Sequence, residues 1–95
     1  MDYQSKIDEY KHMIEELEEV PEDLRDYFWY TRNWMAREQL YLTTFMSCSQ
    51  SGTYTLEDLQ LRKTILAVLE KEKDEAKALM DAYHTEHPLE DSEIQ

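Results

Sequence analysis

The scarcity of turn-forming residues limits the folds available to this chain. Its 95 residues include one Gly and two Pro, the strongest turn formers. A sandwich or barrel of many short strands needs more turns than these residues support. Gly52 alone cannot supply the glycine-rich loops that hold phosphates in Rossmann and P-loop proteins, which excludes both of those classes.

Apolar spacing predicts a first helix over residues 3–19. One stripe recurs at steps of four and three residues, as a helix requires. It consists of Tyr3, Ile7, Tyr10, Ile14 and Leu17. The C-terminal end of this helix is acidic, with carboxylates at Glu15, Glu16, Glu18 and Glu19. Since the helix dipole disfavours negative charge there, that end should either fray or have a basic neighbour.

Pro21 ends the first helix, and a second helix is predicted from about residue 22 to 47, roughly 39 Å long. It carries three apolar stripes. They are Leu24, Phe28, Met35, Leu42 and Phe45; Tyr27, Tyr30, Trp34 and Tyr41; and Trp29, Ala36, Leu40 and Thr43. A helix that is apolar on every side must be covered on more than one side.

Residues 47–53 form the clearest loop. Thr55 with Asp58 three residues on forms an acidic version of the capping box, which opens a third helix over 56–84. Its apolar stripe consists of Leu61, Ile65, Val68, Leu69, Ala76, Leu79, Met80 and Tyr83. Pro88 ends the ordered part, so residues 1–87 are expected to form one domain and residues 88–95 a short, acidic, disordered tail.

These elements predict an all-α, three-helix protein. The second and third helices form a long antiparallel hairpin, and the first helix, roughly 26 Å long, packs on it. Because the short helix cannot cover the whole hairpin, some apolar surface should remain. We therefore expect a homodimeric bundle or a protein partner.

The net charge is −12, from 22 acidic and 10 basic residues. The acidity lies mostly at the two ends: residues 1–26 hold ten acids and three bases, and residues 86–95 hold four acids and no base. Since phosphates would be repelled, we expect no direct binding to nucleic acid or to an anionic membrane. No leader or spanning segment is evident, which favours a cytoplasmic location, in a host cell if the gene came from a phage.

The nearly neutral centre is rich in aromatic residues, with Arg among them. Tyr, Trp and Arg are enriched at binding hot spots, because they combine area with hydrogen bonding or charge. The predicted partner-binding residues are Arg25, Trp29, Tyr30, Arg32, Trp34, Arg37 and Tyr41. Arg25, Trp29 and Arg32 are spaced for cation–π stacking. The other interpretation, that the aromatics fill the core, applies best to Phe28, Met35, Leu42 and Phe45.

A second candidate surface is acidic. It consists of Glu15, Glu16, Glu19, Glu22, Asp23 and Asp26. Carboxylates on successive helical turns stand about 5–6 Å apart, near the repeat of a phosphate backbone, so this row is suited to occupying a nucleic-acid-binding groove. The simpler and more common use of such a row is a solvated face that keeps a small protein soluble.

Enzymatic and metal sites have little support. Glu9 and His12 have the Glu-x-x-His spacing of di-iron bundles, but they lie outside the apolar stripe of their helix. Cys48 is the single cysteine, so it can form neither an intrachain disulfide nor a zinc site, and no basic neighbour in the sequence activates it. We expect no catalytic residue, no metal and no cofactor.

The sequence therefore favours a non-enzymatic protein-binding regulator or inhibitor, with acidic ends that steer it to a basic partner such as a nucleic-acid-binding protein. The alternative is an oligomer that binds a small anionic or aromatic ligand such as a nucleotide. In that case Arg25, Arg32 and Arg37 neutralise the ligand, and Trp29, Tyr30 or Trp34 stacks on it.

Overall fold

The fold is all-α, as predicted. The computed structural model describes residues 3–49 and 54–88, and within them the elements are α1 (Tyr3–Glu18), the 3₁₀ turn η1 (Glu22–Leu24), α2 (Tyr27–Cys48) and α3 (Leu56–Glu86). No strand occurs in these two ranges. The ends of α1 and α3 agree with the predicted limits to within one or two residues. Most of the predicted loop, including Gly52, and residues 89–95 of the predicted tail lie outside the described residues.

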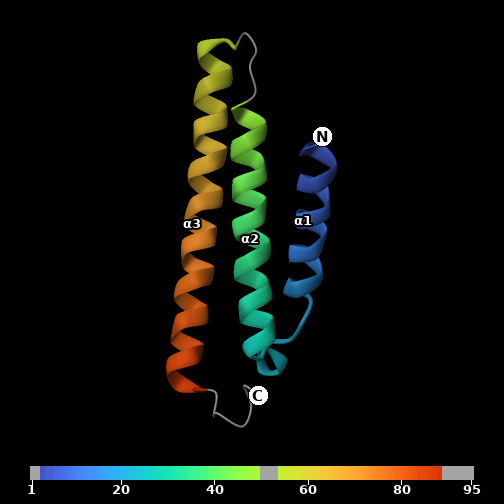
Figure 1. Cartoon of the computed structure of the whole chain (residues 1–95), viewed down its shortest axis with the longest axis vertical. Coiled ribbons are helices and arrows are strands. Elements are labelled where there is room, and N and C mark those ends of the chain that lie inside the picture. The colour runs from blue at the N-terminus through green and yellow to red at the C-terminus, as the bar shows by residue number, and fades with distance from the viewer. Residues whose placement is uncertain (1–2, 50–53, 89–95) are drawn as a thin grey trace.

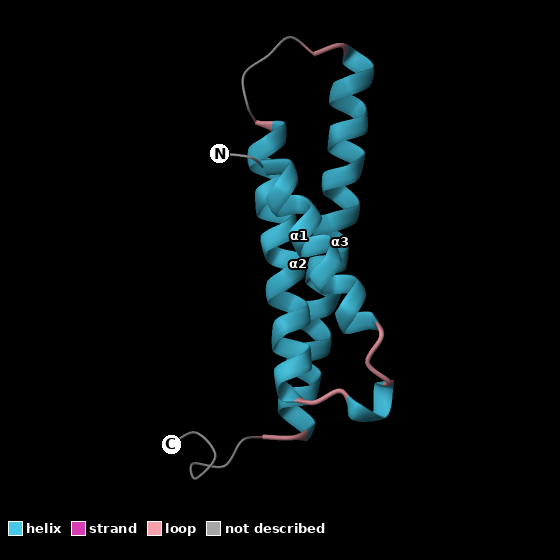
Figure 2. Cartoon of the chain, turned by 90° about the vertical axis from the view of Figure 1, so that its right-hand side faces the viewer, coloured by secondary structure: helices cyan, strands magenta, loops and turns pink. Residues whose placement is uncertain are grey.

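The central helix is α2, which lies between α1 and α3 and runs antiparallel to both (Figure 1). The predicted antiparallel hairpin of α2 and α3 is therefore confirmed. α1 and α3 each pack along α2, but no described Cα of α1 comes within 8 Å of a described Cα of α3. The molecule is 54 Å long and only 26 by 22 Å across, and α1 covers part of the hairpin's length (Figure 2).

α2 begins later than predicted. The sequence indicated one helix from about residue 22, whereas η1 ends at Leu24 and the chain is extended at Arg25 and Asp26. Asp26 is the N-cap of α2, and its carboxylate accepts a hydrogen bond from the Trp29 backbone N–H at 2.9 Å. Asp is among the best N-cap residues because it satisfies a free N–H of the first turn. The preference of Asp26 for the N-cap position therefore outweighs the continuous helix that was predicted to follow Pro21.

The predicted capping box at the start of α3 is confirmed. The Asp58 backbone N–H donates to Thr55 Oγ1 at 3.1 Å, and the Thr55 backbone N–H donates to the Asp58 carboxylate at 3.2 Å. Hydrogen bonds to the Asp58 carboxylate, first from the Thr55 backbone N–H and then from the Thr55 side chain, and the charge of nearby Arg62 lower the pKa of Asp58 below its usual 3.8. The ionised carboxylate therefore stabilises the first turn of α3.

Asp58→Asn should lower the free energy of unfolding at neutral pH, with a pH dependence whose sign follows from the lowered pKa. The contribution of Asp58 is fully present above its unfolded pKa near 3.8 and is lost as the pH falls through the lower folded pKa. Urea denaturation should show a constant difference from wild type above about pH 5, shrinking below 3.8. Asp74→Asn, at an exposed position of α3, is the control. A difference that grows on acidification would contradict the prediction.

The core lies on the α1 side of α2. Ile7 and Ile14 of α1 pack with Ala36 and Leu40 of α2, and Leu69 of α3 packs against this cluster. No large side chain among the described residues is fully buried. The core is therefore thin, as the length of the chain leads one to expect.

The α2 residues to which the core interpretation applied best lie at the surface. They are Phe28, Met35, Leu42 and Phe45, which are 44–71% exposed, and Leu24 of the same predicted stripe is 66% exposed in η1. Trp29, which we expected to be more available to a binding partner, is only 8% exposed. That core assignment was wrong because α1 occupies the face of Trp29 and Ala36, and α3 occupies the face next to it. Neither helix reaches the remaining stripe.

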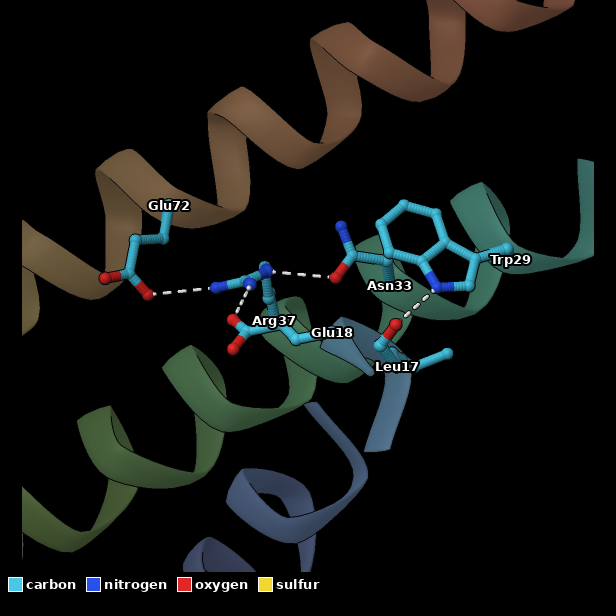
Figure 3. Close-up of polar contacts among 6 residues, drawn as sticks. All are labelled: Leu17, Glu18, Trp29, Asn33, Arg37 and Glu72. Carbon is cyan, nitrogen blue, oxygen red and sulfur yellow. Dashed lines mark hydrogen bonds and ion pairs between the residues drawn. The ribbon is translucent and has the colours of Figure 1, made fainter. Parts of the chain in front are cut away.

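The Trp29 indole ties α2 to the end of α1, since its Nε1–H donates to the Leu17 carbonyl at 2.7 Å (Figure 3). Trp29→Phe removes this hydrogen bond, so the partly buried Leu17 carbonyl keeps only the backbone N–H of Val20, at 3.2 Å, as a donor. We expect a loss of about 1–2 kcal/mol in the free energy of unfolding, measured by urea denaturation. Trp34→Phe, at a half-buried position on the α3 side, should cost less. Equal losses for the two variants would contradict this role of Trp29.

Candidate protein-binding surfaces

Arg37 joins all three helices. From α2 its Nη2 lies 3.0 Å from Glu18 Oε1 of α1, and its Nη1 lies 3.1 Å from Glu72 Oε2 of α3. Its Nε–H donates to Asn33 Oδ1 at 3.1 Å. Figure 3 shows the guanidinium between the two carboxylates, with Asn33 on the side toward Trp29. The basic neighbour expected at the acidic end of α1 is therefore Arg37.

The contact with Asn33 is the most sensitive part of this cluster. Asn33 is 4% exposed, and Arg37 is the one hydrogen-bond partner of its side chain among the described residues. The Arg37 side chain is 17% exposed, whereas Glu18 and Glu72 are 59% and 44% exposed. Partly solvated ion pairs contribute little individually, but a buried amide that loses its partner costs more.

Arg37→Met should therefore lower the free energy of unfolding by about 2 kcal/mol, mostly because Asn33 loses its partner. Urea denaturation of both proteins in low salt and in about 1 M salt separates the causes, since only the ion-pair part is screened. Lys71→Met is the matched control, because Lys71 makes an exposed pair with Glu75 at 4.0 Å. For that control we expect the free energy of unfolding to fall by less than about 0.5 kcal/mol. A loss from Arg37→Met no larger than the control's would contradict the bridging role.

Two other predicted partner-binding residues also face α1. The Arg25 guanidinium carbon lies 4.2 Å from the centre of the Trp29 ring, so the predicted cation–π contact is confirmed for this pair. Arg25 Nε–H also donates to the Val20 carbonyl at 3.1 Å. Arg25, Trp29 and Arg37 are therefore engaged within the chain, where they hold α1 and η1 against α2.

The predicted aromatic residues Tyr30, Trp34 and Tyr41 lie half-buried on the α3 side of α2. Tyr30 stacks on Tyr83 with ring centres 4.6 Å apart. Lys77 Nζ lies 5.8 Å from the Trp34 ring centre, and Lys73 Nζ lies 4.9 Å from that of Tyr41. Only Arg32 of the predicted set is exposed. The seven residues are thus divided among three sides of α2 and do not form one continuous exposed surface.

The predicted acidic surface is exposed throughout. Its members are Glu15, Glu16, Glu19, Glu22, Asp23 and Asp26. Asp26 is committed to capping α2, and Glu16 lies 3.0 Å from His12 Nε2. The other four make no ion pair with any described residue, so their charge faces solvent.

Sequence reasoning missed a groove between α1 and α3. Three adjoining pockets of about 470, 300 and 400 Å³ follow one another along it, with α2 as the floor. We call this the α1–α3 groove. Its α3 wall includes Leu61, Ile65, Leu69, Glu72 and Leu79. Leu61, Ile65 and Leu79, which belong to the predicted apolar stripe of the third helix, are exposed. The difference in length between α1 and α3 was the signal, because a short helix leaves α3 partly uncovered.

A second uncovered surface runs along α2, away from both neighbouring helices. We call it the outer α2 stripe. It consists of Phe28, Arg32, Met35, Gln39, Leu42 and Met46, all of them exposed.

The 400 Å³ pocket at the other side of α2 is lined by Arg25, Trp29 and Arg37, but also by Glu18, Glu72 and Glu75, so its charged lining is net negative. No specific observation therefore favours an anionic ligand there.

The described residues offer little for metal chemistry. Within residues 3–49 and 54–88 no three His, Cys, Asp or Glu side chains come together in a group that could hold a metal ion. Cys48 is a half-buried free thiol. No helix in the described part of the chain is both long and apolar enough to cross a membrane.

No protein-family model, curated protein or solved structure matches this chain. Its function is therefore inferred from the surfaces described above.

Proposed function

We propose that this chain is a protein-binding regulator that accepts an amphipathic, basic helix of its partner in the α1–α3 groove. The observation behind this proposal is the row of exposed Leu61, Ile65 and Leu79 along a groove that runs between two helices. Helix-in-groove binding uses such a row, because apolar residues on successive turns of the incoming helix can reach it. Large exposed apolar side chains gathered along one groove are typical of interaction sites.

Charge selects a basic partner. The chain carries −12, and the acidic surface at the end of α1 and in η1 stays exposed beside the groove. Complementary charge steers the encounter and rejects acidic competitors, while the apolar contacts supply affinity. A nucleic-acid-binding protein presents such a basic surface. By occupying it, this chain would inhibit that protein.

The residues that contact the partner then differ from those expected from the sequence alone. Arg25, Trp29 and Arg37 are used to hold α1 in place, so their replacement would act on folding. The groove wall of α3 and the acidic surface of α1 are the parts left to bind. Variants that test binding should therefore be placed on α3.

The test uses two designed helical peptides of about five turns with the same apolar face, one with Lys and one with Glu at the polar positions. Calorimetric titration of the whole chain should show binding of the Lys peptide with a Kd in the micromolar range, about −8 kcal/mol. Raising salt from about 50 to 300 mM should weaken that binding, since the steering charge is screened. The Glu peptide should not bind.

The matched variants separate the groove from general surface effects. Leu61→Ser/Ile65→Ser changes two groove residues that are 60% and 43% exposed, and it should weaken binding of the Lys peptide at least tenfold with little loss of stability. Leu59→Ser, at a 50% exposed residue outside the groove, should leave it unchanged. Equal binding of both peptides, or unchanged binding by a folded Leu61→Ser/Ile65→Ser protein, would refute the proposal.

A further inference from the structure

The outer α2 stripe has the residue spacing of a coiled-coil seam. Steps of four and three residues lead from Phe28 to Met46, which are about 27 Å apart along the helix. Phe28, Met35 and Leu42 occupy one class of seam position. Arg32, Gln39 and Met46 occupy the other. Neither α1 nor α3 covers this seam, since its four apolar members are 44–71% exposed.

The charge along α2 points to the occupant. Arg32, Arg37 and Glu38 are the only charged residues of α2, and Arg37 is already paired with Glu18 and Glu72. Arg32 is therefore the one charged member of the outer α2 stripe, and it is positive in a chain whose net charge is −12. Two copies of such a chain repel each other at the acidic surface of α1, but the outer α2 stripe has no acidic residue, so at this seam no carboxylate meets another.

We propose that the outer α2 stripe binds a second copy of this chain as an antiparallel helix pair. In a parallel pair Arg32 would face Arg32 of the second copy, which like-charge repulsion disfavours. In the antiparallel pair Arg32 lies opposite Leu42 of the second copy, and Phe28 lies opposite its Met46. A basic protein gains nothing at this seam, because Arg32 repels it. The inference is independent of the α1–α3 groove, which lies on the other side of α2.

The size of the seam sets the expected strength. A standard stable interface buries about 800 Å² and about 20–30 residues on each partner, whereas this seam offers six side chains, two of them polar. The dimer should therefore be weak, with a Kd in the micromolar range. Its salt dependence has a definite sign. Added salt screens the repulsion between the two negative chains, so the dimer should tighten, whereas binding of a basic peptide weakens.

Sedimentation equilibrium of the whole chain over about 1–500 μM tests the association. We expect a monomer–dimer equilibrium that tightens with salt. Met35→Ser should raise Kd about tenfold, and Gln39→Leu should lower it about tenfold, because it replaces a polar seam residue by an apolar one. Leu59→Ser should not change Kd. A lower dimer Kd in the Gln39→Leu protein cannot arise from misfolding, whereas a higher Kd in the Met35→Ser protein could. A protein that is monomeric throughout, or a dimer that responds to neither seam variant, would overturn the proposal.

Disulfide trapping in a Cys48→Ser background tests the orientation. An antiparallel pair brings Phe28 next to Met46 of the second copy and keeps the two copies of Phe28 about 27 Å apart. A mixture of the Phe28→Cys and Met46→Cys proteins should therefore form a disulfide-linked heterodimer under mild oxidation, and Phe28→Cys alone should not cross-link. Efficient cross-linking of Phe28→Cys to itself would overturn the antiparallel orientation.

Discussion

Arg37 is the side chain through which all three helices meet, and the exposed surfaces of the molecule follow from where it lies. Its guanidinium compensates the carboxylate of Glu18 at the unfavourable end of α1, contacts Glu72 of α3, and is the hydrogen-bond partner of the buried Asn33. Beside it, the Trp29 indole holds the last turn of α1. These polar contacts fix which side of α2 is covered by α1. The thin apolar cluster around Ala36 and Leu40 then packs on that side.

Because α1 is held there, two apolar surfaces stay uncovered, and they differ in charge. The α1–α3 groove lies beside the acidic surface, whereas the outer α2 stripe has no acidic residue and the single positive charge of Arg32. We propose the first as the site of a basic partner and the second as the site of another copy of the chain. A dimer through the outer α2 stripe leaves both grooves open, so it would present two partner sites. Such a bivalent arrangement raises the apparent affinity for a partner that itself carries two basic helices.

Local signals in the sequence were sufficient for several elements. Thr55 and Asp58 indicated the capping box, and the acidic end of α1 indicated either fraying or a basic neighbour, of which the structure has the second. The burial of α2 could not be predicted in the same way, because three apolar stripes of similar character compete for two neighbouring helices. The choice depends on contacts of Arg37 with residues 19 and 35 positions away in the chain. Pattern along one helix carries no information about such partners, so Phe28 and Trp29 were assigned to the wrong sides.

Methionine oxidation reports which side of α2 is covered without the need for a substitution. Met35 and Met46 are 51% and 50% exposed, whereas Met80 is 9% exposed. At about 0.01 μM protein, well below the expected micromolar dimer Kd, peptide mass spectrometry after brief peroxide treatment should show fast conversion of Met35 and Met46 to the sulfoxide and slow conversion of Met80. If Met35 is instead as protected as Met80 at that concentration, the outer side of α2 is covered within the single chain, and the arrangement described above is wrong.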